Sequence, residues 1–168
     1  MNWDAIAAVA EITSALAVLA TLLFLARQIQ QSNRIGQGEA ERVWLASWQE
    51  IVASTTADLE TTQLYKQGLH SFSSLDDDQK AMFHTILVGM MDRGDALHRL
   101  HQQGLASTQL LDSIIDGICI GVIKTPGGAE WWAQVGPLFP GYAFFEERRS
   151  SSGVPLTDAL TFLRVNGK

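Results

Sequence analysis

The sequence has one cysteine, four prolines and no block of lysine and arginine among its 168 residues. A lone cysteine excludes an internal disulfide and a thiolate metal cluster. Cys119 lies in an apolar run, which predicts a small buried side chain. The net charge of −6 and the lack of a basic block argue against nucleic-acid binding, because an acidic protein repels phosphate backbones.

Motifs of known chemistry are also missing. The chain has no Gly-x-Ser-x-Gly, no His-Glu-x-x-His and no P-loop. The stretch Thr125-Pro126-Gly127-Gly128 lacks the following Lys and Ser/Thr of a P-loop, so it is interpreted as a helix start. No catalytic residue and no cofactor is therefore assigned. There is also no alternating apolar pattern, repeat or low-complexity tract, so the fold class predicted is all-α.

What is present is a long apolar run at residues 5–26, AIAAVAEITSALAVLATLLFLA. As a helix, about 22 residues extend about 33 Å, enough for a hydrocarbon core of about 30 Å. The run contains one charge, Glu11, and neither Pro nor Gly. A cleaved signal peptide needs a basic start, whereas this chain begins Met1-Asn2-Trp3-Asp4. A buried core helix is rarely this long, so the run predicts a transmembrane helix.

The flanking charges predict an orientation. Asp4 precedes the apolar run, whereas Arg27, Arg34 and Arg42 follow it. Positive residues stay preferentially in the cytoplasm. We therefore expect the N-terminus outside the membrane and the remainder of the chain in the cytoplasm.

One face of this helix carries small residues at helical spacing, with Glu11 at its edge. The face consists of Ala7, Ala10, Glu11, Ser14, Ala17 and Thr21. In one interpretation Glu11 is simply protonated or reaches the headgroups of the bilayer. In another, the face binds a second copy of the chain or another membrane protein, because small residues allow close helix approach in lipid. A third is a channel-like oligomer with Glu11 near its axis.

The domain organisation predicted is an anchor at 1–30, a polar linker or bend at 31–38, and a helical domain at 39–168. Gly36 and Gly38 favour the break. Apolar spacing and helix-start signals predict a bundle-like domain of about five to six helices. Helices are expected at 39–54, 57–68, 75–103, 107–124 and 129–135, while 142–149 and 155–165 are short segments that can also be helical.

Asp95, His98 and His101 follow one another at spacings of three residues. An acid-x-x-His pair is part of di-iron helical bundles, but those sites need a second pair and two more carboxylates. No second pair exists in this sequence. A solvated polar helix face is the favoured interpretation. A membrane-tethered metal-binding sensor or enzyme using these three residues is the alternative.

Aromatic residues gather late in the chain, at Trp131, Trp132, Phe139, Tyr142, Phe144 and Phe145. Such a cluster closes the core of a small domain. The alternative is an exposed groove for a partner helix or a membrane surface.

Three stretches carry a resemblance: the opening Met1–Ala8, the exit Leu25–Arg34, and Pro126-Gly127-Gly128-x-x-Trp131-Trp132. In outline the chain resembles an uncharacterised family of small bacterial membrane proteins. The resemblance implies one N-terminal transmembrane helix in a bacterial inner (cytoplasmic) membrane and an all-helical cytosolic domain. It implies no activity and no active-site residues.

Overall fold

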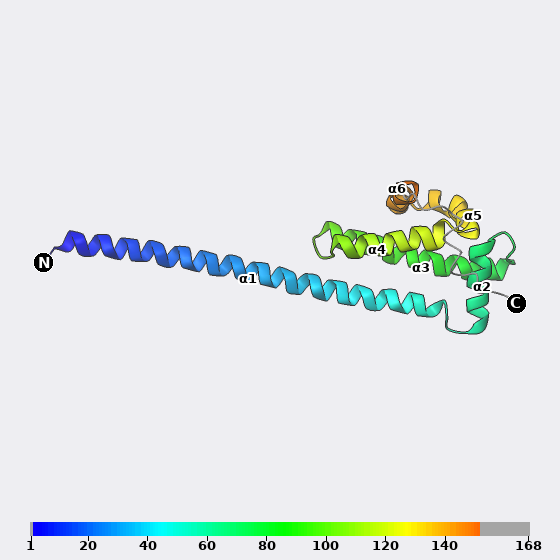
Figure 1. The fold of residues 1–168 in the computed structure, drawn as a ribbon, viewed down its shortest axis with the longest axis horizontal. Coiled ribbons are helices and arrows are strands. Elements are labelled where there is room, and N and C mark those ends of the chain that lie inside the picture. Colours follow the sequence, from blue (N-terminus) through cyan, green and yellow to red (C-terminus); the bar gives the residue numbers. More distant parts are fainter. Residues whose placement is uncertain (1, 152–168) are drawn as a thin grey trace. The chain divides into compact units, whose positions relative to one another are not determined.

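The computed structural model describes residues 2–151, and within them all side chains except those of residues 5, 6 and 9. This part of the chain is all-α: six α-helices, joined by short π- and 3₁₀-helical turns, and no strand (Figure 1). The predicted fold class is confirmed. A long N-terminal helix is followed by a small helical domain. The predicted segment 155–165 lies outside the described residues.

The chain divides into two compact units, Met1–Glu39 and Ala40–Lys168. Helix α1, Trp3–Ser54, begins in the first unit and ends in the second. The predicted start of the helical domain at residue 39 therefore agrees with the division. The predicted break at 31–38 does not exist, because α1 runs through it without interruption.

The continuity of α1 has a simple energetic basis. Each glycine in a helix interior costs about 1 kcal/mol of helix stability relative to alanine. Two glycines therefore do not break a helix whose other residues favour the helical conformation. Gln37, Glu39 and Ala40 are good helix formers around Gly36 and Gly38. The segment predicted as a separate helix at 39–54 is consequently the C-terminal part of α1.

The remaining helices start at side-chain caps. Helices α2, Leu59–His70, and α3, Asp77–Gln102, begin after Asp58 and Asp76. Asp76 forms a capping box with Gln79, whose backbone N–H lies 2.9 Å from the Asp76 carboxylate. Helix α4, Thr108–Ile118, is capped by Ser107, as predicted. In helix α5, Pro126–Val135, Thr125 is the cap and proline occupies the first turn, three residues earlier than predicted.

The predicted helix at 107–124 changes character at Cys119. From Cys119 to Ile123 the chain forms a π-helical turn, η1, in which the Lys124 N–H bonds to the Cys119 carbonyl at 2.8 Å. Two 3₁₀ turns follow α5: η2, Gly136–Leu138, and η3, Pro140–Tyr142. Helix α6, Ala143–Ser151, then includes Ser150 and Ser151, where a loop was predicted.

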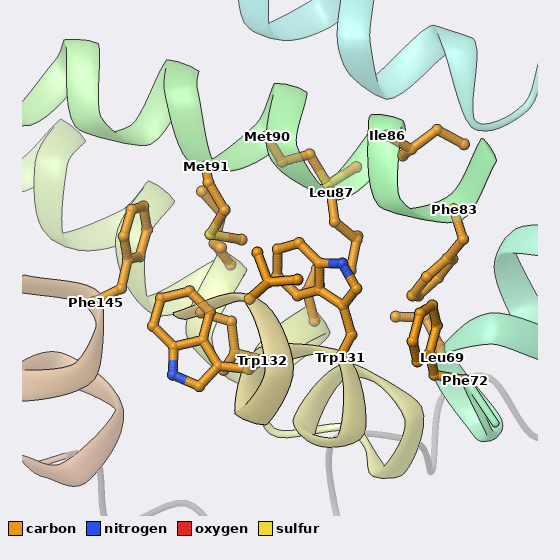
Figure 2. Close-up of a cluster of buried hydrophobic side chains, with 14 of the residues drawn as sticks. Leu69, Phe72, Phe83, Ile86, Leu87, Met90, Met91, Trp131, Trp132 and Phe145 are labelled. Carbon is orange, nitrogen blue, oxygen red and sulfur yellow. The ribbon is translucent and has the colours of Figure 1, made fainter. Parts of the chain in front are cut away.

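The main core of the second unit lies where α2, α3, η1, α5 and α6 meet (Figure 2). Phe83, Leu87 and Met91 from α3 are fully buried against Trp131 from α5 and Phe145 from α6. Burying side chains of this size contributes about 1.5–3 kcal/mol each. This core brings the late aromatic residues onto the middle of α3.

A smaller core includes the end of α1. Trp44 packs with Leu97 and Ala106, and its ring stacks on Trp48 at 5.7 Å between centroids. The Trp44 Nε1–H donates to the Arg93 carbonyl at 2.9 Å, while the Arg93 Nε–H donates to the Ser47 carbonyl at 2.7 Å. Residues from Ala40 to Ser54 are therefore part of the folded helical domain.

Helices α2 and α5 approach so closely that a glycine is required between them. A Cβ added at Gly127 would lie 1.8 Å from the Gly68 carbonyl oxygen and 2.8 Å from the Phe72 nitrogen. Both are backbone atoms, so relief of this clash needs movement of a helix. At exposed Gly117 on α4, an added Cβ would meet nothing within 4 Å.

We expect Gly127→Ala to lower the free energy of unfolding by about 1–3 kcal/mol, the usual cost of overpacking. Gly117→Ala is the matched control and should leave stability unchanged or raise it by up to about 1 kcal/mol, because alanine favours helix. Thermal unfolding followed by circular dichroism measures both. Equal midpoints for the two variants would contradict the close approach of α2 and α5.

Candidate functional site

The N-terminal part of α1 is an apolar surface that nothing in the described chain covers. It is the one helix among the described residues that is long and apolar enough to cross a membrane, with a mean hydropathy of 1.8 over its best 18 residues. None of that window is buried. Leu16, Leu23 and Phe24 are each more than 60% exposed. A soluble monomer rarely leaves so large a continuous apolar surface in water.

The predicted small-residue face lies on this exposed part of α1. Ala7, Ala10, Glu11, Ser14, Ala17 and Thr21 are all exposed and share one side of a continuous helix. The Ser14 hydroxyl donates to the Ala10 carbonyl and the Thr21 hydroxyl to the Ala17 carbonyl, each at 2.8 Å. Both hydroxyls therefore have a hydrogen-bond partner within the helix itself. Glu11 remains the ionisable group on this face.

The histidine group does not form one site. Asp95 pairs with Arg99, whereas the His101 Nδ1 lies 3.0 Å from the Ala106 carbonyl oxygen. The His98 ring stacks on Phe144 at 4.4 Å, and its Nε2 lies 2.9 Å from the Gln102 Nε2. Among residues 2–151, no group of three His, Cys, Asp or Glu side chains is placed to hold a metal ion. The three residues thus have separate local roles.

Most of the aromatic cluster belongs to the core. Trp131 and Phe145 are fully buried, and Trp132 and Tyr142 nearly so, whereas Phe139 and Phe144 are partly exposed. Figure 2 shows the Trp131 ring turned toward the α3 side chains and the Trp132 ring extending toward Phe145. The interpretation as a core-closing cluster therefore holds for four of the six residues.

Three hydrogen bonds fix the polar ends of these rings. The Trp131 Nε1–H donates to the His84 Nδ1 at 3.2 Å, and the Trp132 Nε1–H donates to the Glu146 carboxylate at 2.8 Å. The Tyr142 hydroxyl donates to the Asp92 carboxylate at 2.5 Å. Burial, together with this bond to Asp92, raises the pKa of Tyr142. Each ring thus has a single defined orientation.

Two hollows border the cluster. The larger, about 560 Å³, lies on the outer side of Trp132 and Tyr142 and reaches the Glu146–Arg149 ion pair on α6. The smaller, about 250 Å³, lies between α3, α4 and α6 and is lined by residues that include His98, Asp112, Phe144 and Arg148. Arg148 closes one side of the smaller hollow by donating to Asp112 at 2.7 Å and to Asp116 at 2.6 Å.

Sequence reasoning did not find these ion pairs. Asp112 and Asp116 are four apart on one helix and indicate a common face. Nothing in the sequence indicates that Arg148, more than thirty positions later, binds both. One feature of the sequence points to the larger hollow: residues 131–145, which form most of its lining, include no charged residue.

Comparison with family models, curated proteins and solved structures finds no match. The geometry of the chain itself is therefore the basis for the functional argument. The likeness to small bacterial membrane proteins stays a prediction.

Cys119 is fully buried in η1, as predicted. Its thiol contacts the Phe145 carbonyl oxygen at 3.7 Å. Burial, and secondarily the charge of Asp116, raises the pKa of the thiol to about 12. At neutral pH almost no reactive thiolate is present.

We therefore expect native Cys119 to resist labelling by a maleimide at pH 8, and to react fully once the chain is unfolded in denaturant. Mass spectrometry counts the labels. The matched control is Ser113→Cys, an exposed position on α4, which should take up one label within minutes. Fast labelling of the native protein would show that Cys119 is not buried.

Proposed function

We propose that this chain is a single-pass membrane protein whose N-terminal helix holds a small helical domain at the membrane. The observation that carries this proposal is the exposed apolar surface of α1, of which no part of the best 18-residue window is buried. A bilayer covers such a surface completely, and the length of about 22 apolar residues matches its thickness. The alternative of a buried core helix has no support from the described chain.

The helical domain, in this proposal, acts by binding a partner or by self-association. Support comes from the small-residue face on the anchor. The second reading, a metal-binding sensor or enzyme at Asp95, His98 and His101, is weakened because these side chains bind separate partners. The channel-like reading rests on Glu11 alone.

The orientation proposed is N-terminus outside and domain in the cytoplasm. It rests on Arg27, Arg34 and Arg42 after the apolar run and on Asp4 before it. Protease treatment of spheroplasts separates the two orientations. An N-terminal tag should be cleaved while the domain survives, and the reverse pattern would show the opposite orientation.

Membrane insertion is tested by alkaline carbonate extraction. We expect the native chain in the membrane pellet, and Leu19→Arg with Leu22→Arg in the supernatant, because each arginine near mid-membrane costs about 2.5–3.5 kcal/mol. Ile29→Arg with Ile35→Arg is the matched control. Both isoleucines are exposed on the same helix but lie beyond the apolar run, so this variant should stay in the pellet.

Two outcomes would contradict the anchor. Native protein that is released by carbonate is not an integral membrane protein. Equal release of the two double variants would mean that charge anywhere on α1 weakens binding, as expected for a peripheral contact.

Self-association is tested by crosslinking and mass photometry in mild detergent. If the small-residue face is the interface, Ala10→Leu with Ser14→Leu should convert oligomers to monomers, because leucine prevents close helix approach. Ala8→Leu with Ala15→Leu adds the same type of bulk away from this face and should leave oligomers intact. A native chain that is monomeric, or equal loss in both variants, would exclude this interface.

A further inference from the structure

The larger hollow of the helical domain is built entirely from the end of α5, the turns η2 and η3, and α6. Its volume of about 560 Å³ falls within the range of about 300–1,000 Å³ usual for small-molecule sites. The lining is Trp132, Ala133, Gly136, Pro137, Phe139, Pro140, Tyr142, Ala143, Glu146 and Arg149. It thus combines an apolar wall with one charged pair.

The apolar wall is formed by three rings that lie nearly parallel. Tyr142 is tilted by 21° from Trp132 and by 17° from Phe139. Pro137 and Pro140 border them and restrict the backbone of the turns. No charged residue occurs between Trp131 and Phe145. A ligand that occupies this part of the hollow needs an apolar body.

The carboxylate in the hollow has no capacity left for a ligand. Glu146 accepts from the Trp132 Nε1 at 2.8 Å, from the Arg149 Nε at 2.9 Å and Nη2 at 2.6 Å, and from the Ser150 hydroxyl at 3.3 Å. A carboxylate has about four acceptor sites. These bonds, those from Arg149 first, hold the pKa of Glu146 below its usual value. A cationic ligand would therefore meet an anion that is already neutralised.

Arg149, in contrast to Glu146, still has hydrogen-bonding groups that are not in use. A guanidinium has five N–H donors, and the contacts with Glu146 use the Nε–H and one on Nη2. The other donors have no hydrogen-bond partner among residues 2–151, and the side chain is 35% exposed at the edge of the hollow. A planar guanidinium binds a second carboxylate well at such an edge.

We propose that this hollow is a binding site for a small molecule with an apolar, preferably aromatic, body and a carboxylate group. The body lies against the rings of Trp132, Phe139 and Tyr142, and the carboxylate accepts from the unused N–H groups of Arg149. An anionic ligand is preferred because Arg149 offers unused donors, whereas the Glu146 carboxylate already accepts four hydrogen bonds. This site goes beyond the anchoring and association proposed above and does not depend on either.

The test uses the full chain in lipid nanodiscs and isothermal titration calorimetry, with three probes that share one ring system. They are 2-naphthoate, 2-naphthamide and 2-naphthylmethylammonium, and empty nanodiscs correct for partition into lipid. We expect saturable binding of the anion, at least about tenfold tighter than that of the amide or the cation, as a charge-assisted hydrogen bond provides.

Two variants locate the site. Arg149→Gln should weaken naphthoate binding by about tenfold while leaving the amide unaffected. Arg148→Gln is the matched control, because Arg148 is the preceding residue but binds Asp112 and Asp116 at the other hollow; its naphthoate affinity should equal that of the native chain. Ala143→Phe, at an exposed lining position, should block the hollow for all three probes.

Thermal unfolding by circular dichroism shows that each variant is folded. Should Arg149→Gln not fold, Ala143→Phe decides the location. The proposal is overturned by the lack of saturable binding above empty nanodiscs, by equal affinity for the three probes, by equal losses in the two arginine variants, or by unaltered binding in Ala143→Phe.

Discussion

The helical domain depends on the burial of Trp131 and Trp132 in the core that α3 shares with α5 and α6 (Figure 2). Helix α5 is short, and ten residues cannot be stable as an isolated helix in water. It persists because its two large rings are buried, and because Gly127 lets its N-terminal turn touch the backbone of α2. The turns η2 and η3 and the helix α6 follow from that placement, since Tyr142 and Phe145 both pack on the Trp132 ring. Both hollows border elements positioned in this way.

The first unit has the opposite constraint, since the apolar side chains of its described residues are exposed. Hydrophobic burial is worth about 25 cal/mol per Å² of apolar surface, so exposure of a helix of this kind to water is costly. In the proposed membrane anchoring, lipid supplies the cover. The internal hydrogen bonds of Ser14 and Thr21 suit such surroundings, because unsatisfied hydroxyls are expensive in hydrocarbon.

Local signals predicted much of the fold. Ser107 caps the start of α4, and Gly104, with a positive φ, follows the end of α3, both as expected. Such helix ends are predictable because they depend on residues close by in the sequence. The burial of Cys119 followed from its apolar surroundings. The prediction of a break at Gly36 and Gly38 was wrong, because the free-energy cost of two glycines in a helix is too small to interrupt it. The π-helical turn at Cys119–Ile123 could not be predicted. An apolar run of this composition is equally compatible with an α-helix and with a π-helix.

The contacts that build the hollows could not be predicted for another reason. Tyr142 and Asp92 are fifty positions apart, and Arg148 is 36 positions from Asp112. A pairing of this kind is decided by packing of whole helices and not by spacing along the chain. The aromatic cluster was recognised from its composition, but its division into buried rings and a partly exposed edge depended on where α5 lies.

The use of Trp44 and Trp48 by the helical domain has a consequence for proteolysis. The domain includes the last turns of α1, so a cut within 43–54 would remove part of its core. A cut in the polar stretch from Arg27 to Glu39 would instead release a domain with both cores complete. That stretch is exposed almost throughout, and local unwinding there needs little energy because it contains two glycines. A protease could thus separate the helical domain from the apolar part of α1 without unfolding it.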